Sequence, residues 1–239
     1  MQAIIMAGGK GTRLMPLTRD TPKPLIRIID KPILEYTIEK IRETGITDII
    51  ITLCYMGDKI KEAIGSGEKY RVRIRYVEES YPLGTAGGVK NAEKFIRDDF
   101  LVVSGDAYTD MDFNALIDFH FRKKALATLG VTRVSDPEKF GNVFVNEKGL
   151  ITRFEEKPLR SSTNLVNTGI YVFDKKILKK IPYGFCDFSK NVFPNILGKI
   201  YALECDCFWS DIGTLPSYYM TNYRIALNRD KAVPYTNKY

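Results

Sequence analysis

The sequence predicts an α/β fold whose central sheet is mixed, mostly parallel and flanked by helices. Through the first 135 residues, short apolar segments of strand length alternate with amphipathic segments of helical length. This alternation is typical of a parallel sheet covered by helices. Gly8, Gly84 and Asp106 each follow a predicted strand. Because ligands of such Rossmann-like sheets bind beyond the carboxyl ends of the strands, we expect these residues to share one binding edge.

Hydrophobic periodicity places the elements of the first half. Apolar, β-branched runs predict buried strands, and apolar residues at helical spacing predict amphipathic helices. The predicted strands are 3–7, 48–53, 72–78, 100–104 and 127–134. The predicted helices are 32–43, 59–64, one that follows the glycine-rich stretch 82–88 and ends near 95, and 112–119.

The second half of the sequence has a different pattern. Segments 142–146 and 151–156 flank Glu147-Lys148-Gly149 and predict a hairpin. The other predicted elements are a strand at 166–173, a helix at 189–197, an extended segment at 201–211, a last helix at about 215–227 and a tail. Because no repeat, low-complexity tract or Pro/Ser-rich linker divides the sequence, we expect one domain that holds two ligands side by side.

Composition argues against several classes of protein. The chain has 239 residues, with 36 Lys and Arg against 29 Asp and Glu, and a net charge of +7. The basic residues are scattered without an RNA-binding aromatic signature, so we expect a solvated basic surface and no nucleic-acid partner. No apolar run approaches the ~20 residues of a membrane span and no signal peptide precedes the first strand, so we expect a cytoplasmic protein without membrane association. The four cysteines and single histidine form no zinc pattern.

A glycine-rich stretch, Gly8-Gly9-Lys10-Gly11-Thr12-Arg13, follows the first predicted strand. Glycines at a strand end let backbone N–H groups approach a phosphate closely. Arg13 and Lys23 add positive charge on the two arms of this loop. The stretch lacks the third glycine of G-x-G-x-x-G and the residue order of a P-loop. It therefore indicates neither a dinucleotide oxidoreductase nor a Walker-type NTPase.

A longer stretch, Gly9 to Pro24, is similar to the signature of the sugar-phosphate nucleotidylyltransferases. It reads G-x-G-T-R-L-x-P-L-T and then P-K-P. Further motifs of that family follow in order: Pro82-Leu83-Gly84-Thr85-Ala86, Gly105-Asp106, Gly141, Glu156-Lys157-Pro158, Asn167-Thr168-Gly169-Ile170-Tyr171 and Trp209-x-Asp211-Ile212-Gly213. The resemblance covers residues 3–223 and is greatest to the mannose-1-phosphate guanylyltransferase branch.

The resemblance implies a fold and a reaction. The fold is that of the nucleotide-diphospho-sugar transferases, with a nucleotide-binding half at 1–135, a sugar-phosphate-binding half with a small hairpin-bearing sugar lobe at 136–228, and a tail at 229–239. In the reaction, an oxygen of a sugar 1-phosphate attacks the α-phosphorus of an NTP and pyrophosphate leaves. The nucleophile is already an anion, so the site needs cations, oriented amides and a metal rather than a general base.

The resemblance also assigns the nucleotide and metal residues. Arg13, Lys23 and Asp106 are expected to be catalytic, with Arg13 on the leaving pyrophosphate and Lys23 near the α-phosphate. Asp106 and Asp211 are expected to hold Mg²⁺, a hard ion that prefers carboxylate oxygens. The residues expected to bind the nucleotide are Ala7, Gly8, Gly9, Gly11, Thr12, Arg13, Glu79, Gly84 and Thr85.

The resemblance also implies which residues contact the sugar and which contact the base. Gly141, Glu156 and Asn167 are expected to contact the sugar, and Lys157 its phosphate. Gly84 and Thr85 would pass close to the base. Glu79 stands where many relatives that use pyrimidine nucleotides have glutamine, and a carboxylate can accept from the two adjacent donors of guanine. Its neighbour Glu78 could take the outward face instead, so the role of Glu79 as a reader of the base stays open.

The resulting hypothesis is the joining of GTP and mannose 1-phosphate to give GDP-mannose, with Mg²⁺ as cofactor. One alternative keeps the chemistry and is a glucose-1-phosphate thymidylyl-, uridylyl- or adenylyltransferase. Another is a catalytically silent regulatory subunit that binds a nucleotide-sugar. Tyr218, Tyr219 and Tyr223 have helical spacing in the last helix and could pack or form a subunit contact, and a homodimer is plausible. The sequence shows no β-helix repeat after the last helix, so acetyl transfer is not expected.

Overall fold

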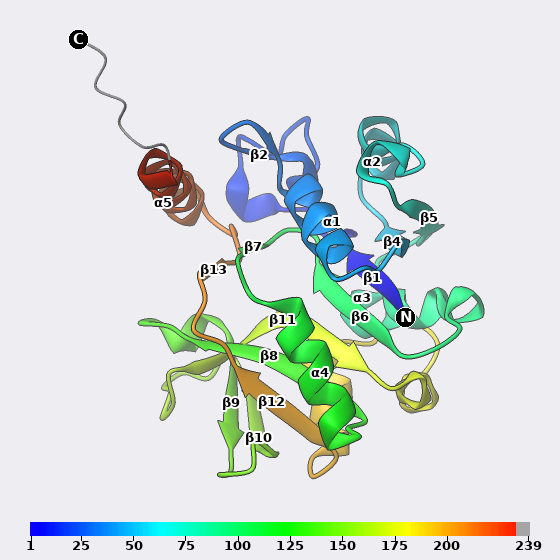
Figure 1. Cartoon of the computed structure of the whole chain (residues 1–239), viewed down its shortest axis with the longest axis vertical. Coiled ribbons are helices and arrows are strands. Elements are labelled where there is room, and N and C mark those ends of the chain that lie inside the picture. Colours follow the sequence, from blue (N-terminus) through cyan, green and yellow to red (C-terminus); the bar gives the residue numbers. More distant parts are fainter. Residues whose placement is uncertain (233–239) are drawn as a thin grey trace.

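The computed structural model describes the backbone of residues 1–232 and the side chains of residues 1–227. A nine-stranded sheet forms its centre (Figure 1). Strands β1 (Gln2–Met6), β4 (Asp48–Leu53), β5 (Arg73–Glu78) and β6 (Phe100–Ser104) are parallel in the order β6-β1-β4-β5. Their apolar residues are buried on both faces, as expected for parallel strands covered by helices.

The remaining strands make the sheet mixed. Strand β11 (Leu165–Phe173) is antiparallel to β6 and to β8 (Ala127–Arg133), while β12 (Ile200–Glu204) is parallel to β8. The predicted hairpin is β9 (Gly141–Val145) with β10 (Ile151–Glu156). The predicted fold class is therefore confirmed.

Strand β11 joins the hairpin to the parallel strands. Its first half pairs with β9 at Val166, and its second half pairs with β6 from Ile170 onward. Between Asn167 and Tyr171 the register with β8 shifts, and Gly169 takes a φ of 78° at this bulge. A left-handed residue inside a strand is accessible to glycine at little cost.

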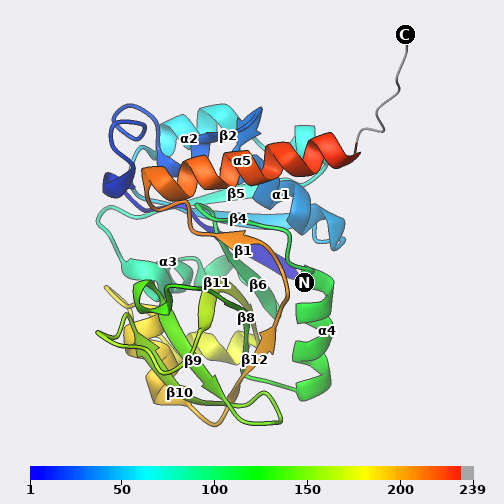
Figure 2. The same cartoon turned by 90° about the vertical axis from the view of Figure 1, so that its left-hand side faces the viewer.

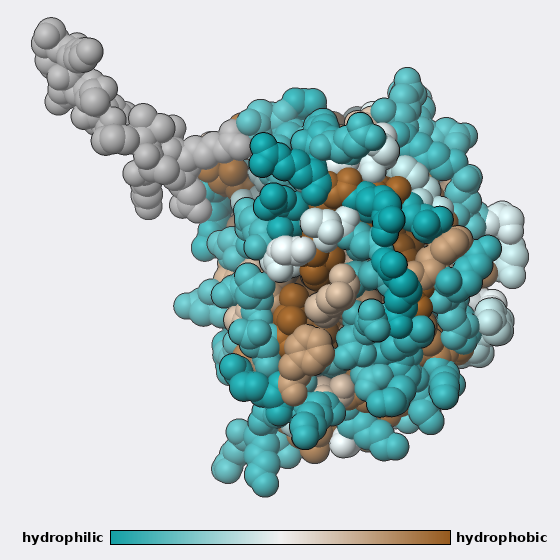
Figure 3. All heavy atoms as spheres, turned by 45° about the vertical axis from the view of Figure 1, so that its right-hand side comes forward, coloured by the Kyte–Doolittle hydropathy of each residue, from teal (hydrophilic) through white to brown (hydrophobic). Residues whose placement is uncertain are grey.

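Helices cover both faces of the sheet (Figures 1 and 2). Helices α1 (Ile33–Glu43), α2 (Gly57–Ile64) and α4 (Phe113–Lys123) bury their apolar sides against one face. The other face packs on α3 (Gly84–Asn91) and on the segment Phe188–Ile196. In Figure 3 hydrophilic side chains dominate the face that is shown.

The predicted helix at 189–197 is wrong. The segment forms a π-helical turn, Phe188–Val192, followed by a 3₁₀ turn, Phe193–Ile196. Pro194 explains the difference, because proline has no N–H to donate within a helix and its ring clashes with the carbonyl four residues earlier. The helix expected to reach residue 95 also ends earlier, at Asn91, and a 3₁₀ turn, Glu93–Phe95, follows it.

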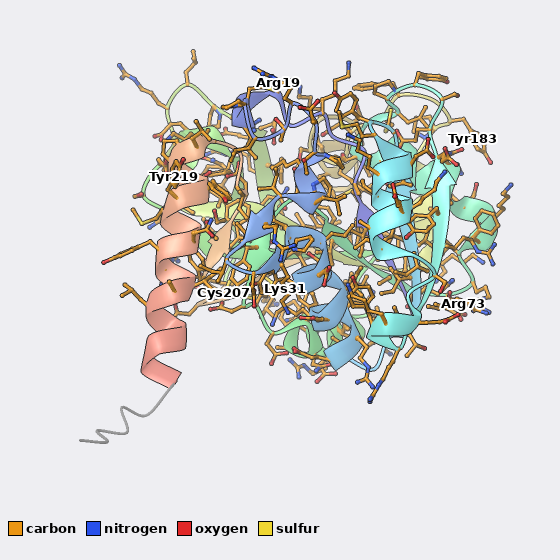
Figure 4. The ribbon with its side chains drawn as sticks, turned by 90° about the horizontal axis from the view of Figure 1, so that it is seen from above. Arg19, Lys31, Arg73, Tyr183, Cys207 and Tyr219 are labelled. Atoms are coloured by element: carbon orange, nitrogen blue, oxygen red, sulfur yellow. The ribbon has the colours of Figure 1, made fainter. Side chains whose placement is uncertain are left out.

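The last helix, α5 (Leu215–Ala232), packs across the edge of the first half. Ile225 joins a separate apolar cluster with Ile28 and Ile33, and Tyr218 packs against it. Tyr219, which is labelled in Figure 4, remains mostly exposed, and so does Tyr223. The predicted subunit contact through them therefore stays a prediction, and residues 233–239 of the predicted tail lie outside the described part of the chain.

Short strand pairs complete the architecture. β2 (Arg27–Ile28) pairs with β3 (Lys31–Pro32), and β7 (Tyr108–Thr109) pairs with β13 (Trp209–Ser210). Within residues 1–232, no helix has both the length and the apolar character required to cross a bilayer.

Candidate active site

The carboxyl ends of β1, β4 and β6 border a cavity of about 320 Å³. Seven of the predicted site residues line it: Ala7, Gly8, Gly9, Glu79, Gly84, Thr85 and Asp106. Gly11 and Thr12 do not line it. A Cβ on Gly11, which has a φ of 65°, would lie 2.9 Å from Lys23 Cβ. Gly11 thus lets the loop turn tightly over Lys23.

Lys23 joins the two predicted metal ligands. It is buried, and its Nζ donates to Asp106 Oδ2 and to the main-chain oxygen of Asp211, both at 2.7 Å. Ser104 Oγ donates to the other carboxylate oxygen of Asp106 at 2.6 Å. Burial alone would raise the pKa of Asp106, but the Lys23 ammonium and the Ser104 hydroxyl outweigh it, so the pKa lies below its ordinary value.

A second cavity of about 500 Å³ is lined in part by Asp211, the residue whose main-chain oxygen accepts from Lys23. Arg13 and Asp211 line this second cavity together with Trp209. The Asp211 carboxylate accepts from the N–H of Gly213 at 3.1 Å. The structure therefore places Arg13 beside Asp211 and apart from the glycine loop's cavity, with Lys23 linking the two sides.

The two aspartates offer a divalent metal a suitable donor set. Both are carboxylates, and the Asp106 side chain is 34% exposed and borders the first cavity. In the described part of the chain, no three His, Cys, Asp or Glu residues gather closely enough to hold a metal ion by themselves. Mg²⁺ does not require such a cage, because it is commonly bound by one or two carboxylates plus substrate phosphates.

Glu79, and not Glu78, faces the first cavity. Glu79 Oε2 accepts from the N–H of Leu83 at 3.0 Å, whereas Glu78 is exposed and paired with Lys61 at 2.6 Å. Burial raises the pKa of Glu79, and the hydrogen bond from Leu83 only partly offsets the rise. The open question of which glutamate borders the cavity is thereby resolved, although its reading of a base stays a prediction.

The start of α3 is held by a loop from the second half. Thr85 Oγ1 donates to Asp187 Oδ2 at 3.1 Å and accepts from the N–H of Phe188 at 2.9 Å. Gly84 has a φ of 76°, and a Cβ there would lie 2.5 Å from the oxygen of Cys186. Glycine is required at position 84 because any side chain there would collide with the backbone of Cys186.

Two cavity residues from the second half of the chain were not predicted from the sequence. Phe185 and Asp187 line the same cavity as Glu79. They lie 100 and 102 residues beyond Thr85, in a stretch without a family motif. Only the tertiary packing of this loop on α3 brings them to the site, so no sequence signal pointed to them.

The predicted sugar residues lie outside the first cavity, on β9, at the end of β10 and on β11. A Cβ on Gly141 would lie 2.9 Å from Glu156 Oε2. Burial raises the pKa of the Glu156 carboxyl, and Lys157 Nζ lies 3.9 Å from Glu156 Oε1. Lys157 takes a φ of 47° and exposes most of its side chain. These three residues therefore form one group that ends in an exposed ammonium, which is paired with Glu156.

Asn167 is held within β11. Its Nδ2 donates to Tyr171 Oη at 2.9 Å, and its Oδ1 accepts from the N–H of Gly169 at 3.1 Å. The side-chain amide thus closes the bulge in β11. A contact between Asn167 and a sugar would use its second N–H or remaining lone pair.

The fold and the two cavities around Lys23 define a nucleotide-binding transferase architecture, and comparison with known proteins gives the family. A family model described as nucleotidyl transferase matches residues 2–227. The chain belongs to this family. The resemblance to sugar-phosphate nucleotidylyltransferases noted in the sequence is thereby confirmed.

Curated relatives carry the name of the expected branch. Mannose-1-phosphate guanyltransferase beta-A of Xenopus laevis is 37% identical over 220 residues, which is 89% of this chain and 61% of that protein. The catalytic subunit beta of mannose-1-phosphate guanylyltransferase from Drosophila melanogaster is 35% identical over 98% of this chain and 65% of its own length. The chain thus spans less than two thirds of these relatives.

Solved structures share the fold over their whole length. A Bacillus anthracis protein, provisionally described as a glucose-1-phosphate thymidylyltransferase and solved with sucrose, superposes with a TM-score of 0.85 at 29% identity, covering 96% of both chains. HddC from Yersinia pseudotuberculosis, complexed with GMP-PN, gives 0.82 at 29% identity over 94% of this chain and 99% of its own.

Proposed function

We propose that this protein joins an NTP to a sugar 1-phosphate and releases pyrophosphate, with GTP and mannose 1-phosphate as the substrates and GDP-mannose as the product. Family membership and the names of the curated relatives support the proposal. A bound guanine-nucleotide analogue in HddC, a structural relative, supports the choice of a purine nucleotide.

The observation that carries the proposal is the position of Lys23. Its buried ammonium contacts Asp106 on one cavity and Asp211 on the other, each at 2.7 Å. A reaction between two polyanions needs a fixed cation where they meet. The ammonium of Lys23 supplies that cation, and the Asp106 carboxylate lies beside it.

In the proposed reaction, an oxygen of the sugar phosphate forms a bond to the α-phosphorus. The bond from that phosphorus to the bridging oxygen of pyrophosphate breaks, and pyrophosphate leaves with the electron pair. Lys23 neutralises charge at the α-phosphate, and Arg13 holds the leaving group. Asp106 and Asp211 would hold Mg²⁺, which supplies further positive charge to the phosphates when bound. Proton transfer is not required, because the attacking phosphate is already ionised.

In this proposal, separate sets of residues bind the nucleotide and the sugar phosphate. The backbone of Ala7 to Thr12 holds the triphosphate, while Glu79, Gly84 and Thr85 border the base. Gly141, Glu156 and Asn167 contact the sugar, and the ammonium of Lys157 reaches its phosphate. We also propose the corresponding division of one domain into a nucleotide half at 1–135 and a sugar-phosphate half at 136–228. A cytoplasmic location, a homodimeric state and the absence of a nucleic-acid partner belong to the same proposal.

The test is pyrophosphate release with Mg²⁺ across five NTPs and several sugar 1-phosphates. We expect the highest kcat/KM for GTP with mannose 1-phosphate, and loss of turnover when the metal is removed with a chelator. Turnover with dTTP and glucose 1-phosphate, but not with GTP, would favour the thymidylyltransferase alternative that the Bacillus anthracis relative suggests. Nucleotide-sugar binding without turnover of any pair would favour the silent regulatory subunit.

A further inference from the structure

An aromatic side chain that no motif includes borders one end of the first cavity. The side chain of Phe185 is 70% exposed, although it lines this cavity together with Pro82 and Gly84. A Cβ built on Gly84 would lie 3.3 Å from Phe185 Cε2. The ring therefore stands against the backbone that borders the base in the proposed function.

The loop that carries Phe185 is fixed in place. The N–H of Cys186 donates to the oxygen of Leu83 at 2.8 Å. The oxygen of Cys186 in turn accepts from the N–H groups of Ala86 and Gly87, both at 3.0 Å. These three bonds tie the residue next to Phe185 to the start of α3. The exposed ring is thus presented at the cavity by an anchored backbone.

Neighbouring aromatic residues have other partners. Tyr183, at the molecular edge in Figure 4, donates from Oη to Glu93 Oε2 at 2.9 Å, and its ring lies 4.7 Å from Lys90 Nζ. Phe188 is buried in a ring cluster with Tyr171. Within the described side chains, Phe185 takes part in no ring pair or cation–π contact of this kind. Its cavity-facing surface is available to a ligand.

The lining of the cavity combines two kinds of chemistry. Phe185 and Pro82 supply apolar surface, and Asp106, joined to the buried Lys23, supplies charge. Glu79 adds a hydrogen-bond acceptor on the cavity wall. A nucleoside triphosphate is divided in the same way into a flat base with polar edges and a polyanionic tail.

We propose that Phe185 is a base-stacking residue that covers one face of the nucleobase and favours a purine over a pyrimidine. This inference rests on the proposed function and deepens it. Glu79 would read the edge of the base, and Phe185 would contact its face. An aromatic ring stacks on any base, but the overlap grows with the size of the base, so a purine gains more than a pyrimidine.

The experiment is calorimetric titration of the full chain with GTP and with UTP, in the presence of Mg²⁺ and without a sugar phosphate, so that no turnover occurs. We expect Phe185→Ala to bind GTP about tenfold more weakly, as base-stacking side chains do when truncated, with a smaller loss for UTP. Phe185→Leu should remain weak and Phe185→Trp should recover most of the affinity. The matched control is Tyr183→Ala, which removes an exposed ring from the same loop.

The outcomes separate this inference from the proposed function. If the wild-type protein binds GTP and Phe185→Ala binds it equally well, the stacking role is overturned while the proposed function stands. An equal loss in Tyr183→Ala would also overturn it, because the effect would then belong to the loop as a whole. If the wild-type protein binds no NTP, both proposals fail.

Discussion

Lys23 is the residue on which the site depends most. Its ammonium is buried and satisfies the Asp106 carboxylate and the carbonyl of Asp211 at the same time. Because the pKa of Asp106 is lowered, its carboxylate stays charged at neutral pH. The stabilising contribution of that charge is lost only as the pH falls below the ordinary value of 3.8, toward the lowered pKa.

Lys23→Met is expected to reduce kcat by about 100-fold or more, since it removes the fixed cation at the α-phosphate. The free energy of unfolding should also fall by about 1–3 kcal/mol, because two acceptors lose their donor. Steady-state kinetics and denaturant unfolding measure the two effects. The control is Lys61→Met, which breaks an equally short but surface pair with Glu78 and should change neither quantity appreciably. Wild-type turnover in Lys23→Met would contradict the assignment.

Glu79 gives the site a pH dependence. Burial raises its pKa above the ordinary 4.5. As the pH falls, Glu79 is therefore protonated earlier than an ordinary glutamate, and an acceptor for the guanine donors is lost. We expect the Kd for GTP to rise as the pH falls from neutral, and to begin rising at a higher pH than an ordinary glutamate would produce.

Glu79→Gln should remove this pH dependence. The N–H of Leu83 now donates to Glu79 Oε2 at 3.0 Å. In the variant, the same N–H would donate to the oxygen of the glutamine amide and so fix the orientation of that amide. The amide NH₂ would then face the cavity and donate to a uracil or thymine oxygen, so preference should move from GTP toward UTP or dTTP by about tenfold. Titrations at several pH values measure both changes. An unchanged pH profile would exclude Glu79 as the titrating group.

At the scale of elements, the contact between α3 and the loop around Cys186 sets the shape of the first cavity. Gly84 and Gly45 are both left-handed, with φ values of 76° and 83°. A Cβ would meet the oxygen of Cys186 at 2.5 Å in the first case and nothing within 4 Å in the second. Both positions therefore require a left-handed backbone conformation, but only Gly84 is also in close contact with a neighbouring backbone atom.

Gly45→Ala is expected to cost about 1–2 kcal/mol of unfolding free energy, which is the cost of a left-handed residue with a side chain. Gly84→Ala should cost about 1–3 kcal/mol more, because the loop must also move away. Only Gly84→Ala should weaken GTP binding. Thermal unfolding and calorimetry of the two variants test this, and equal effects on binding would show that the close contact is unimportant.

For the whole molecule, buried strands were the most predictable feature. Strands β4 and β6 match the predicted ranges 48–53 and 100–104, because an apolar run buried on both faces leaves little choice of boundary. The glycine loop, Gly84 and Asp106 were expected at one edge, and the cavity places them there. Two-residue strands such as β7 and β13 contain too few positions for any periodicity to appear.

The site features that the sequence did not predict arise from contacts between segments that are distant in the chain. Phe185 and Asp187 reach the cavity only because their loop packs on α3. The placement of Arg13 beside Asp211, across Lys23 from the glycine loop's cavity, likewise follows from how the segment 209–213 crosses the first half. Local sequence patterns do not predict which distant segments contact each other. Family motifs predict such contacts only for the residues that the motifs include.

The dual pairing of β11 limits how the two proposed halves can move. One strand hydrogen-bonds to β9 with its first part and to β6 with its second, so the halves share a continuous ladder rather than a linker. Bending is least costly where the ladder with β8 is already interrupted, between Asn167 and Tyr171. Closure over two substrates would therefore be a small torsion of the sheet centred beside the sugar residues.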